Sequence, residues 1–350
     1  MARIEDIRFR EVVRPLRTTF STSLGQKQHL HNVMVQVVLE DGRSGIGEVP
    51  TSFAYPHETV DVIRRMLSRA RTQLRGAPIE DYRQRVESFR RAFPRAMMTV
   101  SGLEVALFRA SLQEEGVSEY AHWGMARTRL ETDITIPFLD DEGLLFRWIA
   151  SAIGQGFVTY KLKVSGNMER DRAVLALIYR ALTAKVPGFR LRLDGNQGYR
   201  AVSCLDFLKH LEKMRYDIEL FEQPLRKDDF HGFEEIRDRG RIPIILDETV
   251  LSFDDAKRAI DNRLGGGINV KLAKSGIEES LKIMELARQN KMKLMAGCMI
   301  ETMVGLSAAM FLALGTGFFD YIDLDSVHFL FGRNTYPGLS IKGPVISIEG

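Results

Sequence analysis

Three acidic residues at the ends of short apolar runs are candidates for binding a metal ion. They are Asp194, Glu222 and Asp247, and the gaps between them are long enough for one helix and two short loops. Each run is typical of a buried strand in a parallel sheet, so the three carboxylates would converge at one edge. Any one of them alone is more simply explained as a loop acid. Because three carboxylates without a cation would repel one another, their repeated spacing predicts a site for a hard divalent metal ion.

Lysines at two other strand ends could move protons. Lys161 and Lys163 alternate, which places both on one face of a strand, and Lys271 follows four strands later. Two alternating lysines alone more often mark a solvated strand edge. In a closed eight-stranded barrel, however, Lys271 would lie opposite Lys163, so that each could reach one face of a planar carbanion. We expect the charge of Lys161 to lower the pKa of Lys163, which favours a neutral amine that acts as a base.

The elements that must position these residues begin after an N-terminal α+β region. Alternation over 4–13 and an Asp-Gly turn within 31–49 predict a strand and a hairpin. The Thr/Ser-rich segment 18–25 has no regular period, and we expect it to be a loop. Strands followed by helices describe an α+β domain, and helical periodicity covers 57–74, 79–93 and 97–115.

From about Glu131 onward, strands and helices alternate strictly. Eight strands are expected, each but the last followed by a helix, which implies an α/β fold with a parallel (β/α)₈ barrel. The expected strands cover 132–137, 157–164, 189–194, 216–222, 244–247, 268–272, 293–297 and 321–323. The expected helices cover 142–155, 168–185, 199–214, 230–239, 253–262, 277–289 and 302–314.

We therefore predict a modified (β/α)₈ TIM barrel with an N-terminal α+β capping domain that the C-terminal tail completes. The predicted limits are 1–125 for the capping domain, 126–328 for the barrel and 329–350 for the tail. The tail alternates weakly between apolar and polar residues, so we expect it to return and pair with the N-terminal sheet.

The composition excludes several classes of function. The chain has 49 basic and 46 acidic residues, a balance that argues against nucleic-acid binding. Its two cysteines, Cys204 and Cys298, have no motif spacing, and charges near the N-terminus occupy positions where a signal peptide needs an apolar core. The longest apolar stretch, 305–319, is too short to span a bilayer. A cytoplasmic protein without membrane or nucleic-acid partners is expected.

The ordered set of motifs resembles the enolase superfamily, in its muconate-lactonizing subgroup. Its motifs stand here in the family's order over nearly the whole chain, namely Lys-x-Lys at 161–163, Asp-x-Asn at 194–196, Glu-Gln-Pro at 222–224, Asp-Glu at 247–248 and then Lys271. Members of this superfamily use a lysine or histidine base, with Mg²⁺ stabilising the enediolate that forms when a proton next to a carboxylate is removed.

The resemblance also implies roles for individual residues. Asp194, Glu222 and Asp247 would bind one Mg²⁺ per subunit, which Mn²⁺ could replace, and the acid and base would be Lys163 and Lys271. Lys161, Asn196 and Glu248 would tune the base and orient the site. The residues expected to contact the substrate are Lys161, Thr135, Cys298, Met299, Gly25, Asp323 and Asp325, and Glu301 is expected to support the site.

The end of the eighth strand bears on which reaction is catalysed. Asp323 and Asp325 resemble the paired aspartates with which dipeptide epimerases of this family hold the substrate's α-ammonium group. One such acid could simply cap the following segment. The pair favours a dipeptide epimerase, which inverts the α-carbon of the C-terminal residue by 1,1-proton transfer. An N-acylamino acid racemase, an o-succinylbenzoate synthase and a muconate-type cycloisomerase remain alternatives, whereas the intact set of acids and lysines argues against a non-catalytic barrel.

Substrate specificity is expected to come from the cap loops at 18–25 and 49–55. Relatives that act on acidic dipeptides such as Ala-Glu carry a basic residue where this chain has Gly25, with Lys27 nearby. This difference favours dipeptides with an apolar C-terminal residue. The expected partners are therefore a small-molecule dipeptide and further copies of the chain in a homo-oligomer.

Overall fold

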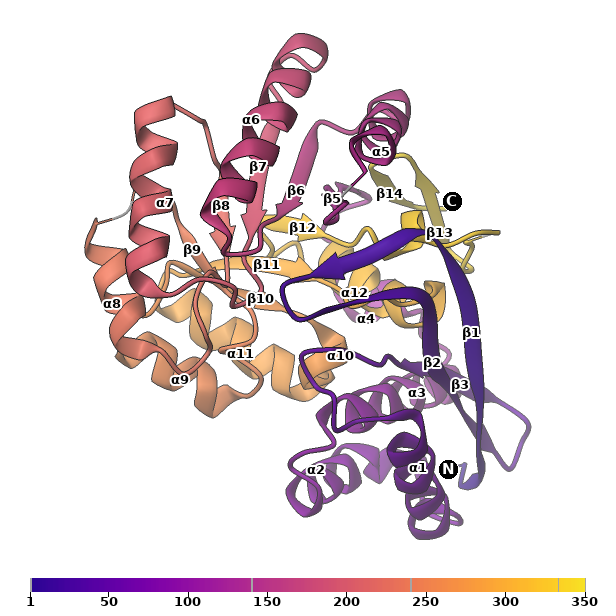
Figure 1. The fold of residues 1–350 in the computed structure, drawn as a ribbon. Helices are drawn as coiled ribbons and strands as arrows, with labels where there is room; N and C mark the ends of the chain where they lie inside the picture. Colours follow the sequence, from indigo (N-terminus) through magenta and orange to yellow (C-terminus); the bar gives the residue numbers. More distant parts are fainter. Residues whose placement is uncertain (1, 140, 240, 333, 350) are drawn as a thin grey trace.

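A barrel of parallel strands forms the larger part of the computed structural model, and an antiparallel sheet with its helices covers one side of it (Figure 1). The structure describes residues 2–139, 141–239, 241–332 and 334–349. None of the helices within these ranges is both long and apolar enough to cross a membrane.

The barrel confirms the predicted α/β architecture. Its strands are hydrogen-bonded in chain order, and neighbouring strands are parallel. They are β5 (Ile134–Ile136), β6 (Thr159–Lys163), β7 (Arg190–Asp194), β8 (Leu220–Glu222), β9 (Ile244–Leu246), β10 (Gly267–Val270), β11 (Lys293–Gly297) and β12 (Tyr321–Asp323). The first and last strands meet where the Asp133 amide donates to the Ile322 carbonyl at 3.3 Å, which nearly closes the barrel.

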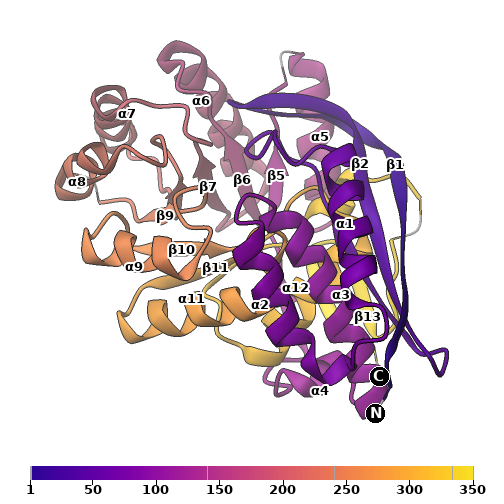
Figure 2. The same cartoon turned by 90° about the horizontal axis from the view of Figure 1, so that it is seen from below.

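Helices surround the barrel, and several begin and end where the periodicity predicts. They are α5 (Glu142–Gly154), α6 (Met168–Lys185), α7 (Ala201–Met214), α8 (Phe230–Arg239), α9 (Phe253–Asp261), α11 (Ile277–Gln289) and α12 (Met303–Thr316). Side-chain caps start many of them, as at Asn167 before α6 and Ser252 before α9. Helix α12 is buried on nearly all sides because it lies between the barrel strands and the cap (Figure 2). The element directly after β12 is a short turn, η2 (Ser326–Phe329).

The cap has the predicted strands and helices, but its first hairpin is much longer than expected. The cap elements are β1 (Ile4–Thr22), β2 (Gly25–Leu39), β3 (Ser44–Val49), α1 (Val60–Leu74), η1 (Ile79–Asp81), α2 (Tyr82–Ala92), α3 (Met97–Glu115) and the short α4 (Glu119–His122). The prediction of an irregular loop at 18–25 is wrong, since Phe20 pairs with Lys27 and Thr22 with Gly25. The hairpin end at 18–25 extends beyond the cap core. Neither of its faces therefore shows the apolar alternation by which a strand is recognised in a sequence.

The C-terminal tail does not join the N-terminal sheet as predicted. Its strands, β13 (Leu339–Lys342) and β14 (Val345–Ile348), pair with each other and with β4 (Arg129–Glu131) in a separate sheet. The edge of β4 is available just before the barrel begins, and Leu130 lies buried opposite Ile346. Among the described backbone pairings, the tail contacts β1 through an isolated bridge between Leu330 and Leu16. The domain limits at 125 and 328 remain predictions.

Buried carboxylates of the cap bind the N-termini of two barrel helices. Glu48 of β3 accepts hydrogen bonds from the Thr302 hydroxyl at 2.6 Å and the Gly305 amide at 3.0 Å, at the start of α12. Glu104 of α3 accepts from the amides of Ile277 and Glu278, each at 3.0 Å, at the start of α11. A carboxylate is favoured at a helix N-terminus because it meets unpaired amides and the positive end of the helix dipole. The two contacts therefore fix the cap over the barrel.

We predict that Glu48→Ala lowers the free energy of unfolding by about 2–4 kcal/mol, because it leaves buried donors at the start of α12 without an acceptor. Denaturant unfolding measures this change. The matched control is Glu40→Ala, at an exposed position of the same domain, which should change stability by less than about 0.5 kcal/mol. Equal effects of the two substitutions would contradict the assignment of Glu48 to the junction.

Candidate active site

The carboxyl ends of the barrel strands open into a cavity of about 80 Å³ that the cap covers. The β1–β2 hairpin extends over this end of the barrel (Figure 1), and the Ser23 hydroxyl at its tip donates to the Asn196 carbonyl at 2.6 Å. Cap segment 51–55 forms another part of the wall. The predicted site residues that line the cavity are Thr135, Lys161, Lys163, Asn196, Asp247, Glu248, Lys271, Cys298, Met299, Asp323 and Asp325.

Of the three strand-end acids, Asp247 lines this cavity and Asp194 and Glu222 do not, and lysines contact all three. Asp194 and Glu222 are fully buried, and Asp247 is 3% exposed. The Lys163 ammonium donates to Asp194 Oδ2 at 2.5 Å, and the Lys271 ammonium donates to Asp247 Oδ2 at 2.6 Å. Although burial alone would raise their pKa values, the neighbouring lysines hold the pKa of both aspartates below the ordinary range.

Other acids at this end of the barrel have raised pKa values, and some of the oxygens there have no hydrogen-bond partner among the described residues. Burial, and then the charge of Asp194, raises the pKa of Glu222 to about 7. Burial, and then the charge of Asp247, raises the pKa of Glu248 to about 8. The buried atoms Asn196 Oδ1 and Glu248 Oε2 have no hydrogen-bond partner among the described residues. Such a set of oxygens fits a hard divalent cation.

The proton-transfer candidates lie on opposite sides of the cavity. Lys163 ends β6 and Lys271 follows β10, and four steps in the strand order separate β6 from β10 in the eight-stranded sheet. Lys163 also lies 5.7 Å from the centroid of the Phe20 ring of the cap. Burial would lower the pKa of Lys271, but Asp247 and Glu222 together raise it above the ordinary value. Lys271 is therefore held as an ammonium group on Asp247, and Lys163 donates to Asp194 on the other side of the cavity.

Lys161 lies deeper and contacts acids from both sides. Its ammonium donates to Glu222 Oε2 at 3.3 Å and to Asp323 Oδ2. Burial opposes its charge, but Asp323 and Glu222 raise its pKa well above the ordinary value. Lys161 thus connects the predicted metal end of the site to the predicted ammonium end. Its expected effect on the pKa of Lys163 remains a prediction.

The acid pair at β12 faces the cavity as predicted from its spacing. Asp323 ends the strand, and Asp325 Oδ2 accepts from the Thr135 amide of β5 at 2.6 Å. Burial, and then Asp323, raises the pKa of Asp325 to about 6. Burial and the same aspartate also raise the pKa of the Cys298 thiol well above its usual range. This end of the cavity is therefore rich in negative charge and suited to a cationic group of a ligand.

Comparison with known proteins identifies the family. A model of the family described as enolase C-terminal domain-like matches residues 145–345. The chain belongs to the enolase superfamily.

Relatives within this superfamily match nearly the whole chain. A hydrophobic dipeptide epimerase of Citrifermentans bemidjiense is 32% identical over 91% of this chain and 88% of its own. The substrate-liganded L-Ala-D/L-Glu epimerase of Bacillus subtilis is 28% identical, with a TM-score of 0.90 over 99% of this chain and 97% of its own. The dipeptide epimerase of Cytophaga hutchinsonii, complexed with Mg and D-Ala-L-Val, is 26% identical, with a TM-score of 0.91 over 99% of this chain and 94% of its own.

This enolase-superfamily site also contains residues that the sequence analysis missed. Lys274, in the short helix α10 (Leu272–Ser275), is buried and donates to Asp247 Oδ1 at 2.5 Å and to the Asn269 carbonyl at 3.1 Å. Asn269 Nδ2 donates to Glu222 Oε1 at 2.6 Å. The alternation of Asn269 with Lys271 was a usable signal. Lys274 had no such signal, because the strand was predicted to extend to residue 272 and the helical turn of α10 was not predicted.

The cap residue Gly25 does not line the cavity, and its neighbour Lys27 does. A Cβ atom at Gly25 would lie 3.0 Å from the Phe53 ring, so that ring occupies the space of a side chain there. The Lys27 ammonium donates to the Thr51 carbonyl at 3.1 Å. Burial lowers the pKa of Lys27 to about 8, although Glu301 partly opposes this shift.

Glu301 supports the segment that follows β11. Its Oε2 accepts from the Met299 amide at 3.1 Å, which orders the loop that carries Cys298 and Met299 into the cavity wall. Burial, and then Glu48, raises the pKa of Glu301 to about 8. This placement agrees with the supporting position expected from the sequence.

We predict that Mg²⁺ raises the melting temperature of the protein and that Glu222→Gln removes most of this effect. A ligand at about 100 times its dissociation constant adds about 2.7 kcal/mol of stability, and the substitution removes one charged ligand. Differential scanning calorimetry with and without Mg²⁺ measures the shift. The control is Glu212→Gln on the exposed face of α7, which should keep the full shift. A shift of the same size in Glu222→Gln would place the metal elsewhere.

Proposed function

We propose that this protein is a Mg²⁺-dependent dipeptide epimerase that inverts the α-carbon of the C-terminal residue of a dipeptide. The observation that carries this proposal is the combination of Lys163 and Lys271 on opposite sides of one cavity with Asp323 and Asp325 at its end. Two opposed lysines suit a proton transfer that changes configuration. The acid pair suits a substrate with a free ammonium group.

The residues that would hold Mg²⁺ are Asp194, Glu222 and Asp247. When bound, the ion supplies positive charge that offsets the negative charge developing on the substrate carboxylate as the α-proton leaves. Unpaired oxygens of Asn196 and Glu248 support this assignment, because they lie where polar groups can orient the ligands.

The two lysines would act as a pair of acid and base on opposite faces of the α-carbon. The lysine on the side of the hydrogen accepts the α-proton, and the lysine on the other side donates a proton to the planar carbanion. In the present structure both ammonium groups bind acids that we assign to the metal. A divalent cation on those acids would release the lysines toward the substrate.

Asp323 and Asp325 would bind the N-terminal ammonium group and thereby fix which α-carbon lies between the lysines. With this group held at β12, the C-terminal half of the dipeptide extends toward the three metal-site acids. Thr135 supports the arrangement, since its amide donates to Asp325 Oδ2 and holds that carboxylate at the cavity wall. Cys298 and Met299 would form the adjoining wall.

The relatives support this activity and leave the side-chain preference open. Their names include both a hydrophobic dipeptide epimerase and an L-Ala-D/L-Glu epimerase. We propose dipeptides with an apolar C-terminal residue, because Phe53 lies against Gly25 and offers an apolar surface there. The competing observation is Lys27 in the cavity wall, which favours acidic dipeptides. An N-acylamino acid racemase is a second candidate, but its substrate has no ammonium group for the acid pair.

A cytoplasmic location and a homo-oligomeric state also belong to this proposal. They rest on the sequence, and cell fractionation and light scattering would test them.

We expect Lys163→Ala and Lys271→Ala each to lower the epimerisation rate by at least about 100-fold, since each removes one of two proton-transfer groups. Either variant should still exchange the α-proton of a single stereoisomer with solvent deuterium, because the other lysine remains. Proton NMR in D₂O follows both processes. Lys227→Ala, an exposed lysine outside the cavity, is the control. Epimerisation by Lys271→Ala at the wild-type rate would show that the two-base assignment is wrong.

We expect Asp323→Asn to lower kcat/KM for free dipeptides about ten-fold or more, because a charge-assisted hydrogen bond contributes roughly 1.5–3 kcal/mol. N-acetylation of the dipeptide should have a similar effect on the wild type and little further effect on the variant. Steady-state kinetics with matched free and acetylated dipeptides measures both. Faster turnover of N-acyl amino acids than of any free dipeptide would favour the racemase instead.

A further inference from the structure

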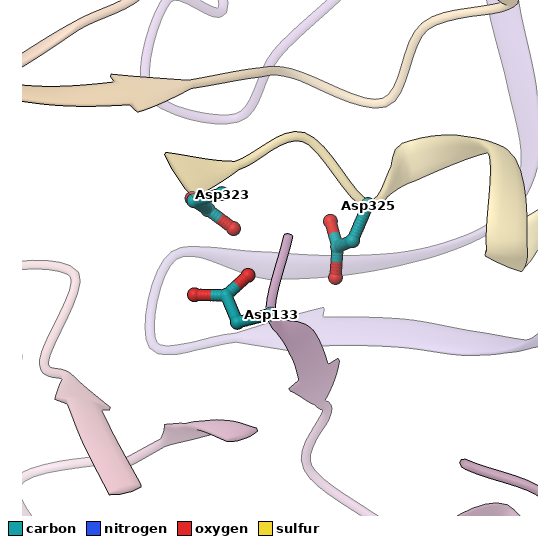
Figure 3. A group of neighbouring side chains, drawn as sticks. All are labelled: Asp133, Asp323 and Asp325. Carbon is teal, nitrogen blue, oxygen red and sulfur yellow. The ribbon is translucent and has the colours of Figure 1, made fainter. Parts of the chain in front are cut away.

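Asp133 is a fully buried acid just before β5 to which the roles above give no function. Its carboxylate lies with those of Asp323 and Asp325, and one oxygen of each lies within 4.8 Å of the others. Figure 3 shows the carboxylates directed toward one another. Asp133 is not among the residues that line the cavity, so it lies behind the acids that we assign to the substrate's ammonium group.

One oxygen of Asp133 and one of Asp323 already have a cationic partner. Asp133 Oδ2 accepts from Arg192 Nη1 at 2.7 Å, and Asp323 Oδ2 accepts from Lys161. The second oxygen of each, Oδ1, is buried and has no hydrogen-bond partner among the described residues. Buried carboxylate oxygens without partners are costly, so a proton or another cation must lie between these acids.

The two cationic groups that face Asp133 cannot supply this charge alone. Arg192 also binds Glu219 Oε2 at 2.5 Å, and Lys161 also binds Glu222. Four charged groups face Asp133 from the neighbouring elements. They are Lys161 of β6, Arg192 of β7, and Asp323 and Asp325 at the end of β12. Burial, and then the charge of Asp323, raises the pKa of Asp133 well above its usual range. Neighbouring carboxylates of this kind commonly share one proton.

We propose that Asp133 is a positioning residue for the substrate's ammonium group, one that shares a proton with Asp323 in the empty site and releases it when the ammonium group binds. This inference rests on the proposed dipeptide substrate. On binding, the O–H bond of the shared proton breaks and the proton leaves through the cavity to solvent. The ammonium group then provides the positive charge. The acids are thereby shielded from one another while the site is empty, and all three are negative when the substrate is held.

The test is the pH dependence of KM in Asp133→Asn at saturating Mg²⁺. An asparagine there can accept from Arg192 and donate to Asp323, so it imitates the protonated acid. Because binding releases a proton from the wild type, its KM falls as pH rises, whereas the variant keeps only the dependence that Asp325, with its pKa of about 6, imposes. The ratio of the two KM values should therefore grow with pH, by at most about ten-fold per pH unit. The kcat should not change, since Asp133 does not touch the reacting atoms.

The matched control is Glu219→Gln, which removes an acid from the same arginine without changing the acid cluster. Its KM should keep the pH dependence of the wild type. A KM of Asp133→Asn that rises by the same factor at every pH, or that does not change, would overturn the inference. So would a wild-type KM that follows the concentration of Na⁺ or Mg²⁺ instead of pH, because a metal cation would then occupy the cluster.

Infrared difference spectroscopy of the free protein tests the shared proton without any substrate. Glu222, Glu248 and Glu301, with raised pKa values of about 7 to 8, also contribute C=O bands of protonated carboxylic acids. The diagnostic band is therefore the one that the wild type and Glu219→Gln share and that Asp133→Asn lacks. Absence of this band from the wild type overturns the inference. If the band is present but no free dipeptide is turned over, the proposed function fails and the shared proton stands.

Discussion

The burial of many charges at the mouth of the barrel is the constraint on which the rest of the structure depends. Asp194, Glu222 and Asp247 are nearly inaccessible to water, and so are the lysines that face them. Removing one partner from a buried ion pair costs several kcal/mol, so each of these acids needs a cation beside it whenever it is charged. In this structure lysines supply it. A metal ion on the same acids would free the lysines for other contacts, and the proposed chemistry uses this exchange of partners.

The fold holds these charges in place through contacts outside the barrel mouth. Glu48 and Glu104 bind the cap to the starts of α12 and α11, and Ser23 binds the hairpin tip to the loop after Asp194. The Lys274 ammonium donates to both the backbone carbonyl and the carboxylate of Asp247 and so fixes that acid. The cap therefore closes a cavity whose polar base is already fixed by the barrel. Variation in the cap can change what the cavity accepts without disturbing the acids.

The sequence was sufficient to predict the barrel and to place Lys163, Asp194 and Glu222 at the ends of its strands. The strands ending in Lys163 and Asp194 alternate between apolar and polar residues. The strands ending in Leu246 and Gly297 are mostly apolar, so strand ends could be located from either pattern. Helices α6, α8 and α11 have the predicted limits, since their periodicity and end signals agree.

Other features depend on tertiary contacts that no local pattern records. The hairpin end at 18–25 is extended only because residues 20–22 pair with 25–27 of β2 beyond the cap core. The tail pairs with β4, a strand in which Leu130 is the one buried residue between two exposed charged residues, so it has no apolar run to mark it. Asp133 resembles an ordinary acid before a strand until β12 brings Asp323 and Asp325 against it. Lys274 becomes significant only when a helical turn brings it under Asp247.

A dipeptide library incubated in D₂O with the protein and Mg²⁺, and then analysed by tandem mass spectrometry, tests the central claim most directly. The account predicts deuterium at the α-carbon of the C-terminal residue of free dipeptides, fastest where that residue is apolar, and no incorporation when Mg²⁺ is chelated. Incorporation at the N-terminal α-carbon, or none in any free dipeptide, would contradict it.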